Sequence, residues 1–228
     1  MFDKRALQYM FTLRFYHSAW PLVLIACLIA FIFHMLSWIF LKKMFIALGC
    51  FVLYFFRNPK RYTADLRNTI VSPADGNIVE ISESMPPTGY GLDDQKMKKV
   101  GIFLSPLNVH INRIPVTGMI EQNVYHPGQF LNAISHRAGT HNERRGIVIK
   151  MPDGKKVLCI QVSGFIARRI ICNVQRGDSV TKGNSYGIIC FGSRVELYLP
   201  TETDLLVTIN QGLRAGESVI GLLPQDGI

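Results

Sequence analysis

The sequence lacks the cysteine and histidine patterns that hold metals or disulfide frameworks. Its five cysteines, an odd number, include no C-x-x-C pair, and its six histidines include no H-E-x-x-H motif. These absences argue against a disulfide-stapled secreted fold and against a zinc site. We therefore expect no metal, and a reducing compartment.

Acidic residues are also scarce. The chain carries 16 Asp and Glu against 25 Lys and Arg, a net charge of +9 that suits nucleic acid, phosphate or an anionic membrane surface. No helix-turn-helix, zinc-finger or ribonucleoprotein pattern accompanies this charge, so we expect no nucleic-acid partner. Because an apolar segment is present, lipid head groups are the favoured partner.

That apolar segment runs from Ala19 to Phe56 and is interrupted by His34, Ser37 and the pair Lys42-Lys43. As continuous helix it would span roughly 57 Å, against a hydrocarbon core of ~30 Å. We therefore expect an N-terminal transmembrane helical segment, within a membrane anchor of residues 1–60. The segment forms either a helical hairpin or one long span with a short one.

Basic residues flank both ends of the apolar segment, with Lys4 and Arg5 before it and Lys60 and Arg61 after it. A hairpin places both groups on the cytoplasmic side, in agreement with the positive-inside rule, whereas a single span leaves one group outside. The hairpin is favoured. It predicts a protein of the inner cell membrane with its body on the cytoplasmic side.

Residues 61–228 change to short strand patterns punctuated by glycine and proline, with one short helix expected at 132–141. The predicted fold class is mainly β, a flattened barrel or sandwich. Two stretches, 174–188 and 209–222, each read as strand, glycine turn, link, glycine turn and strand, like the half-motifs of a biotinyl/lipoyl barrel. Such a carrier displays a lysine between its halves, but here Gly192-Ser193 and a strand lie there.

The stretch from Cys190 to Pro200 is where we expect chemistry. After Ser193, apolar and polar residues alternate with the period of a half-buried strand. The Ser193 hydroxyl lies beside the carbonyl of Gly192, which has no Cβ to shield it, and can attack that carbonyl if a base is near. An isolated Gly-Ser pair is usually a simple bend, so the choice between a bend and a reactive serine depends on the rest of the chain.

Six separated segments occur together in one family, and on them the chain resembles the phosphatidylserine decarboxylases of the short, membrane-anchored, self-cleaving type. In chain order they are FFRNP at 55–59, SPADG at 72–76, LSPLNVH at 104–110, NER at 142–144, GFIARRI at 164–170 and FGSRV at 191–195. The resemblance implies an enzyme that converts phosphatidylserine to phosphatidylethanolamine and CO2.

It further implies cleavage between Gly192 and Ser193 into a β chain, 1–192, and an α chain, 193–228, which stay together as a heterodimer. Ser193 then becomes a pyruvoyl group that forms a Schiff base with the substrate amine. The chemistry requires such a group, because decarboxylation leaves charge on Cα and no protein side chain delocalises a carbanion. Homo-oligomer formation and acyl-chain preference stay open.

The resemblance also implies roles for other residues. His110 is a candidate proton donor or carboxylate partner, since histidine changes charge near neutral pH. Asp75 is either a turn aspartate or the residue that orients the processing base. The lipid phosphate is expected to bind Arg168, Arg169 or Arg113. Long bacterial members carry a second histidine where this chain has Arg113, which leaves the base for self-cleavage open.

Two rival functions stay open. The same chemistry fits another serine-headed lipid, such as an ether lipid. A non-enzymatic membrane-anchored adaptor with a lipoyl-like barrel is the rival of a different class. Such adaptors usually carry a long helical hairpin inserted in the barrel, and the heptad pattern of that hairpin is absent from the sequence.

Overall fold

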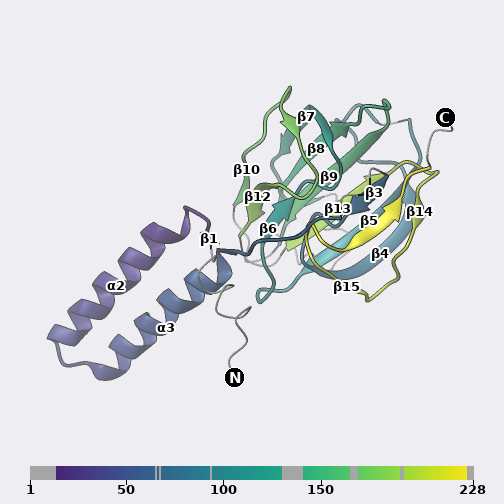
Figure 1. Cartoon of the computed structure of the whole chain (residues 1–228). Coiled ribbons are helices and arrows are strands. Elements are labelled where there is room, and N and C mark those ends of the chain that lie inside the picture. Colours follow the sequence, from purple (N-terminus) through teal and green to yellow (C-terminus); the bar gives the residue numbers. More distant parts are fainter. Residues whose placement is uncertain are drawn as a thin grey trace, which may run out of the picture. The chain divides into compact units, whose positions relative to one another are not determined.

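The computed structural model describes residues 14–64, 66, 68–92, 94–129, 141–164, 169–190 and 193–224. It divides into two compact units, Met1–Lys60 and Arg61–Ile228 (Figure 1). All but the last residue of the helix expected at 132–141 lies outside the described residues. The two units are described separately.

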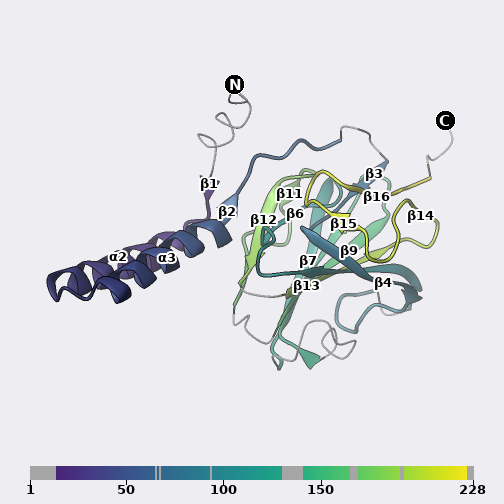
Figure 2. The same ribbon diagram turned by 90° about the horizontal axis from the view of Figure 1, so that it is seen from below.

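The N-terminal unit is a pair of antiparallel helices. Helices α2 (Ala19–Met35) and α3 (Ile39–Phe55) are joined by three residues and lie side by side (Figures 1 and 2). Ser37 in the connection has a φ of 60°, a left-handed conformation that allows a sharp reversal. The short strands β1 (Arg14–Phe15) and β2 (Arg57–Asn58) pair antiparallel at the open end of the hairpin.

Burial in this unit is the reverse of that in a water-soluble helix pair. The buried residues of α2 are the small ones, Ala19, Ala26 and Ala30, and Gly49 of α3 lies against Ala26. Large apolar side chains point outward, such as Leu24 at 67% exposure. Within the described residues, neither helix reaches the combination of length and hydropathy required of a membrane span, each having 17 residues. The predicted membrane crossing therefore stays a prediction.

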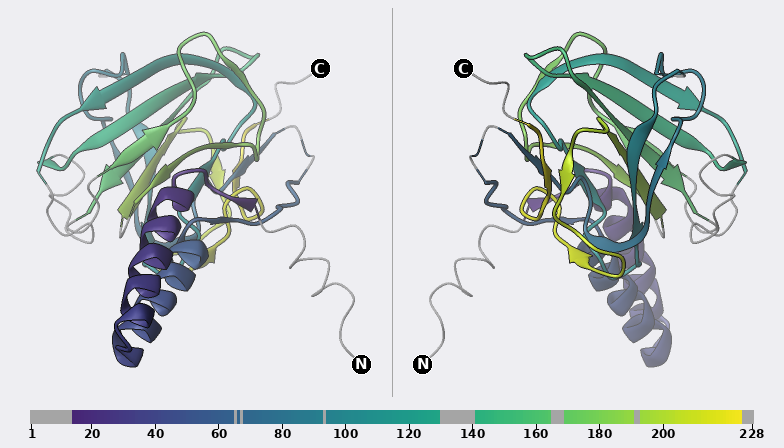
Figure 3. Two further views of the ribbon diagram at one scale, coloured as in Figure 1. Left: turned by 90° about the vertical axis from the view of Figure 1, so that its left-hand side faces the viewer. Right: turned by 90° about the vertical axis from the view of Figure 1, so that its right-hand side faces the viewer.

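The second unit is built on one large antiparallel sheet, so the prediction of a mainly β protein is confirmed. Its strand order is β11-β7-β8-β9-β13-β5-β4-β15, and the sheet curls into a half-barrel (Figure 3). The strands, in that order, are Ser179–Val180, Gly118–His126, Arg144–Lys150, Lys156–Ser163, Ser193–Leu199, Met97–Leu104, Gly76–Ser84 and Gly212–Leu213.

Two three-stranded sheets complete the unit. The first has the order β10-β12-β6 and the second β14-β16-β3. Their strands are, respectively, Ile170–Cys172, Ser185–Ile189 and Ile111–Arg113, and Asp204–Leu205, Val219–Leu222 and Thr69–Val71. Branched apolar residues from all three sheets share one hydrophobic core. The two glycine-turn stretches supply β11 with β12 and β15 with β16. Their likeness to lipoyl half-motifs stays a prediction.

Strand β13 lies inside the large sheet, with β9 on one edge and β5 on the other. The sequence predicted a half-buried strand, and this is wrong: all seven residues are buried. Val195, Leu197 and Leu199 enter the hydrophobic core. Arg194, Glu196 and Tyr198 alternate with them and face the other side of the sheet.

The second face is also buried, and its charged side chains are paired with one another. Arg194 and Glu196, each 1% exposed, contact one another, and Arg194 also pairs with Glu80 of β4. Lys99 of β5 bridges Glu80 at 3.2 Å and Glu196 at 3.1 Å, and the Tyr198 hydroxyl donates to Glu196 at 3.0 Å. Buried charges persist only when paired in this way.

Acidification tests this network at Glu80. Burial alone raises the pKa of Glu80, but Lys99 and Arg194 outweigh it and hold the pKa below its ordinary value of 4.5. The pKa of Glu80 is lower in the folded state than in the unfolded state. The resulting stabilisation is therefore complete above the unfolded-state pKa and is lost as the pH falls through the folded-state pKa.

We expect Glu80→Gln to lower stability at neutral pH by about 1–3 kcal/mol and to weaken the acid dependence below pH 4.5. Thermal unfolding of both proteins between about pH 3 and pH 7 measures this. The control is Glu83→Gln, which removes an exposed ion pair with Lys96 and should change little. Equal acid dependence in wild type and Glu80→Gln would contradict the assignment.

Candidate active site

Ser193 is the first residue of β13 and lies between Leu104 of β5 and Ser163 of β9. Its side chain points to the same face as Val195, toward the core. The residue is fully buried, and its Oγ makes no hydrogen bond to any described residue. A buried hydroxyl without a partner is costly to a fold, about 1–3 kcal/mol, and so marks a candidate functional atom.

His110 reaches the same region through the strand register. Leu104 pairs with Ser193, and Ile111 pairs with Ile188, so residues 105–110 connect the strand beside Ser193 to the strand beside Ile188. The backbone carbonyl of His110 accepts from the Ile189 N–H at 3.4 Å. The structure therefore brings the fully buried His110 close to Ile189, which precedes Ser193 by four residues.

The LSPLNVH segment also determines which histidine nitrogen is basic. Its turn is closed by the Ser105 N–H, which donates to Asn108 Oδ1 at 2.9 Å. His110 Nδ1 lies 3.0 Å from the Asn108 carbonyl oxygen. A carbonyl only accepts, so Nδ1 carries the proton of the neutral ring and Nε2 is the nitrogen that takes up or returns one.

Sequence reasoning missed a group of neutral polar residues on the inner face beside Ser193. Ser163 is its cross-strand partner, and Gln161 follows two positions along β9 on the same face. The Gln161 Nε2 group donates to Asn112 Oδ1 of β6 at 2.8 Å, which connects two sheets. Asn142 Nδ2 donates to the Ser163 carbonyl at 2.8 Å. A glutamine at an inward position of an otherwise apolar strand was the signal available.

Asp75 lies elsewhere, in an ionic cluster. Its Oδ2 accepts from Arg61 at 2.7 Å, and its Oδ1 accepts from the Ala215 N–H at 2.7 Å. Arg61 also pairs with Glu217 at 3.2 Å. Asp75 precedes β4, and β5 separates β4 from β13, which puts about 10 Å between the two strand backbones. A role for Asp75 in orienting the processing base stays a prediction.

Gly76 allows this placement of Asp75. A Cβ at position 76 would overlap the backbone carbonyl of Phe103 on the neighbouring strand, so only glycine fits there. The Asp-Gly pair predicted as a turn is therefore also a point of close backbone approach.

Arg113 belongs to the Asp75 cluster and not to the inner face beside Ser193. Its Nη1 donates to the Gly183 carbonyl at 2.8 Å. Burial and the charge of Arg61 lower the pKa of Arg113, while Asp75 and Glu217 oppose that shift. Its neighbour Asn112 is the β6 residue that points to Gln161, and adjacent strand residues point to opposite faces.

Arg169 lies beside the chain that leads into Ser193. Its carbonyl accepts from the Cys190 N–H at 3.1 Å, and its side chain is exposed. Burial raises the pKa of Cys190 to about 11, against the opposing charge of Arg169, so this cysteine is a neutral thiol. Gly192 and Arg168, also predicted as site residues, lie outside the described residues.

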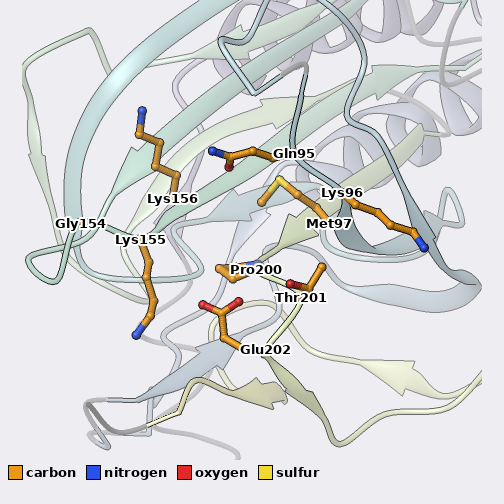
Figure 4. A pocket seen from close by; sticks show the side chains of 9 residues that line it. All are labelled: Gln95, Lys96, Met97, Gly154, Lys155, Lys156, Pro200, Thr201 and Glu202. Carbon is orange, nitrogen blue, oxygen red and sulfur yellow. The ribbon is translucent and has the colours of Figure 1, made fainter. Parts of the chain in front are cut away.

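A separate cavity of about 450 Å³ lies at the other end of β13, where Pro200 follows the strand. The strand length puts it roughly 20 Å from Ser193. Figure 4 shows the neighbouring lysines Lys155 and Lys156 pointing to opposite sides of it. These lysines pair with Asp153 and Glu121. Across the described ranges, no three His, Cys, Asp or Glu side chains are arranged to hold a metal ion.

Comparison with known proteins decides the family. A family model described as phosphatidylserine decarboxylase matches residues 48–221. The chain belongs to the phosphatidylserine decarboxylase family. This confirms the resemblance found in the sequence, and the match spans the six motif segments of the family.

Two relatives show how far the similarity in this family extends. The phosphatidylserine decarboxylase proenzyme of Rickettsia rickettsii is 46% identical over 177 residues, which cover 76% of this chain and 77% of that protein. The proenzyme of the same name from Geotalea uraniireducens is 40% identical over 207 residues, covering 91% of this chain and 95% of that protein.

The ionic cluster of Asp75 leads to a stability prediction. Asp75→Asn keeps an oxygen for the Ala215 N–H but leaves the buried Arg61 without its closest counter-charge. We expect a loss of about 3–5 kcal/mol, the usual cost of breaking a buried ion pair. Denaturant unfolding measures this loss. Asp153→Asn, in an exposed turn pair with Lys155, is the control and should cost less than about 1 kcal/mol; equal losses would refute the cluster.

Proposed function

We propose that this protein is a self-processing, pyruvoyl-dependent enzyme that converts phosphatidylserine to phosphatidylethanolamine and CO2. The observation that carries the proposal is the position of Ser193 in a chain of this family. It begins the central buried strand, and its hydroxyl is held in the interior without a partner among the described residues. An unpaired, buried serine hydroxyl at this position supports a reaction of Ser193 with its own backbone.

Self-cleavage uses the Ser193 hydroxyl. Its Oγ adds to the Gly192 carbonyl carbon, the peptide C–N bond breaks, and the Gly192 acyl group passes to Oγ as an ester. A base then removes the Cα proton of residue 193, and the Gly192 carboxylate leaves to give dehydroalanine. Addition of water and loss of ammonia complete the pyruvoyl group. His110 Nε2 is our candidate for these proton transfers.

The residues around Ser193 fit a carbonyl group. Ser163 Oγ is a buried donor with no hydrogen-bond partner among the described residues. A pyruvoyl ketone supplies the electron sink that decarboxylation needs. The chain's own residues orient the head group, exclude water and return a proton to Cα, and we assign that last step to His110.

Strand pairing supports a stable heterodimer of the two cleaved chains. After a cut before Ser193, β13 still has β5 on one edge and β9 on the other, both from the β chain. The α chain also supplies β15, which pairs with β4, and β16, which pairs with β3. Apolar burial and strand hydrogen bonds persist without the peptide link, so the chains should separate only on denaturation.

The helical hairpin supports association with a membrane. The buried residues of α2 are all alanines, and many large apolar residues of both helices are exposed, an arrangement typical of helices packed in lipid. We propose that this unit anchors the enzyme at the inner cell membrane, with the body on the cytoplasmic side, where basic residues favour anionic head groups. Of the predicted phosphate-binding arginines, the exposed Arg169 fits best, since it lies beside the chain entering Ser193.

Ser193→Ala tests the chemistry. Wild-type protein should run as two chains on a denaturing gel, and the chain of residues 193–228 should have a blocked N-terminus that reacts with hydrazine. Ser193→Ala should stay one chain with no measurable decarboxylation, because both steps need the hydroxyl. Ser179→Ala, at an exposed position of β11, is the control. Wild-type lipid turnover by an uncut Ser193→Ala protein would rule the proposal out.

Vesicle flotation tests the anchor. Leu24→Asp or Ile46→Asp introduces a charge at an exposed apolar position of α2 or α3. Each should weaken partition into anionic vesicles roughly a hundredfold, since Asp in a lipid-facing helix centre costs ~2.5–3.5 kcal/mol. Leu206→Asp, at a comparably exposed position of the second unit, should float as wild type. Unchanged flotation of the helix variants would refute the anchor.

A further inference from the structure

The pair of buried amides Gln161 and Asn112 has no role in the chemistry described so far. Gln161 is 1% exposed and Asn112 is fully buried. Their one mutual hydrogen bond, 2.8 Å from Gln161 Nε2 to Asn112 Oδ1, joins the large sheet to the sheet of β6. Gln161 Oε1 and Asn112 Nδ2 make no hydrogen bond to any described residue.

The pair therefore offers one acceptor and one donor to a ligand. Whichever amide donates in the mutual bond, one carbonyl oxygen and one NH2 group are left over. A buried polar group left unpaired costs about 1–3 kcal/mol, and packing apolar residues there would avoid that cost. Retaining both groups suggests that they bind something polar.

The position of the pair indicates what that ligand is. Gln161 is the cross-strand partner of Val195 and lies diagonally from Ser193, a separation of about 7–8 Å that a long side chain bridges. Asn112 follows His110 by two residues, so the two project to the same side of an extended chain. The amides thus lie between the residue that makes the reactive carbonyl and the candidate proton donor.

The surroundings of the pair are neutral. Arg194 points to the opposite face of β13, and Arg113 is engaged by the Gly183 carbonyl and the Asp75 cluster. Ser163 and Asn142, which complete the buried polar group, are uncharged at every accessible pH.

We propose, on the basis of the proposed function, that Asn112 and Gln161 bind and orient the α-carboxylate of the serine head group. Asn112 Nδ2 donates to a carboxylate oxygen, and Gln161 fixes the orientation of the Asn112 amide.

A neutral donor suits a carboxylate that is about to leave. The carboxylate loses its negative charge as CO2 forms, so a cation bound to it would stabilise the ground state more than the transition state. An amide NH2 also holds the carboxylate in one orientation, but its hydrogen bond depends less on the carboxylate's negative charge than the attraction of a cation does. Removing water from a carboxylate in such a site also favours loss of CO2.

Reductive trapping separates carboxylate recognition from every other step. Cleaved enzyme is mixed with cyanoborohydride and either phosphatidylserine, which carries the carboxylate, or phosphatidylethanolamine, which lacks it. Mass spectrometry of the chain of residues 193–228 measures the total lipid adduct, including any phosphatidylserine adduct that loses CO2 before reduction. The readout requires neither turnover nor product release.

The test variant is Asn112→Leu/Gln161→Met, which replaces both partners by apolar groups of similar shape and should fold. We expect full self-cleavage, phosphatidylethanolamine trapping within about twofold of wild type, and phosphatidylserine trapping reduced about 10- to 100-fold. Asn112→Asp, which opposes a carboxylate with a like charge, should show the same selectivity. Thr203→Val removes a buried, unpaired hydroxyl beyond the far end of β13 and should behave as wild type.

Each outcome of the trapping experiment supports or overturns the inference. Equal loss with both lipids, or no loss with either, overturns carboxylate recognition but leaves the decarboxylase function standing. Failure of both amide variants to cleave assigns the pair to self-cleavage and also overturns the inference. If wild-type protein forms no adduct with either lipid, the proposed function itself fails.

Discussion

Strand β13 is paired along its length with β5 and β9, and its side chains are buried on both faces of the sheet. The rest of the second unit depends on this constraint. Because the backbone of Ser193 is held by two neighbours, the residue has a defined orientation before any bond is broken. Under the proposed cleavage, the same pairing would hold residues 193–228 in place through hydrogen bonds and apolar burial.

The polar groups on the two faces of β13 differ in charge and in pairing. On one face the charges of Arg194, Glu196, Lys99 and Glu80 satisfy one another, which stabilises a buried network. On the other face the polar groups beside Ser193 are neutral and partly unsatisfied. Ion pairing stabilises the charged face, whereas unpaired neutral groups on the other face leave capacity for a ligand. Ser193, the proposed reactive residue, lies on the face whose polar groups are partly unpaired.

The helical unit exposes large apolar side chains, whereas the β unit buries its apolar side chains in a core. The two helices approach closely through small residues, Ala26 against Gly49, although Val52 and Phe55 of α3 are also buried. In water this packing would be unfavourable, because many large apolar side chains of the helices stay exposed. In lipid it carries no such penalty, since the surroundings of the helices are as apolar as their side chains.

The sequence by itself determined the class of fold, the apolar hairpin segment and the family, because periodicity, composition and motif order are local properties of the chain. It also singled out Ser193, since a Gly-Ser pair before an alternating strand is visible in a few residues. Only the tertiary structure decided that Gln161 meets Asn112, and that Asp75 and Arg113 share a cluster with Arg61. These contacts join distant strands, and their register depends on how whole sheets pack, which no local pattern encodes.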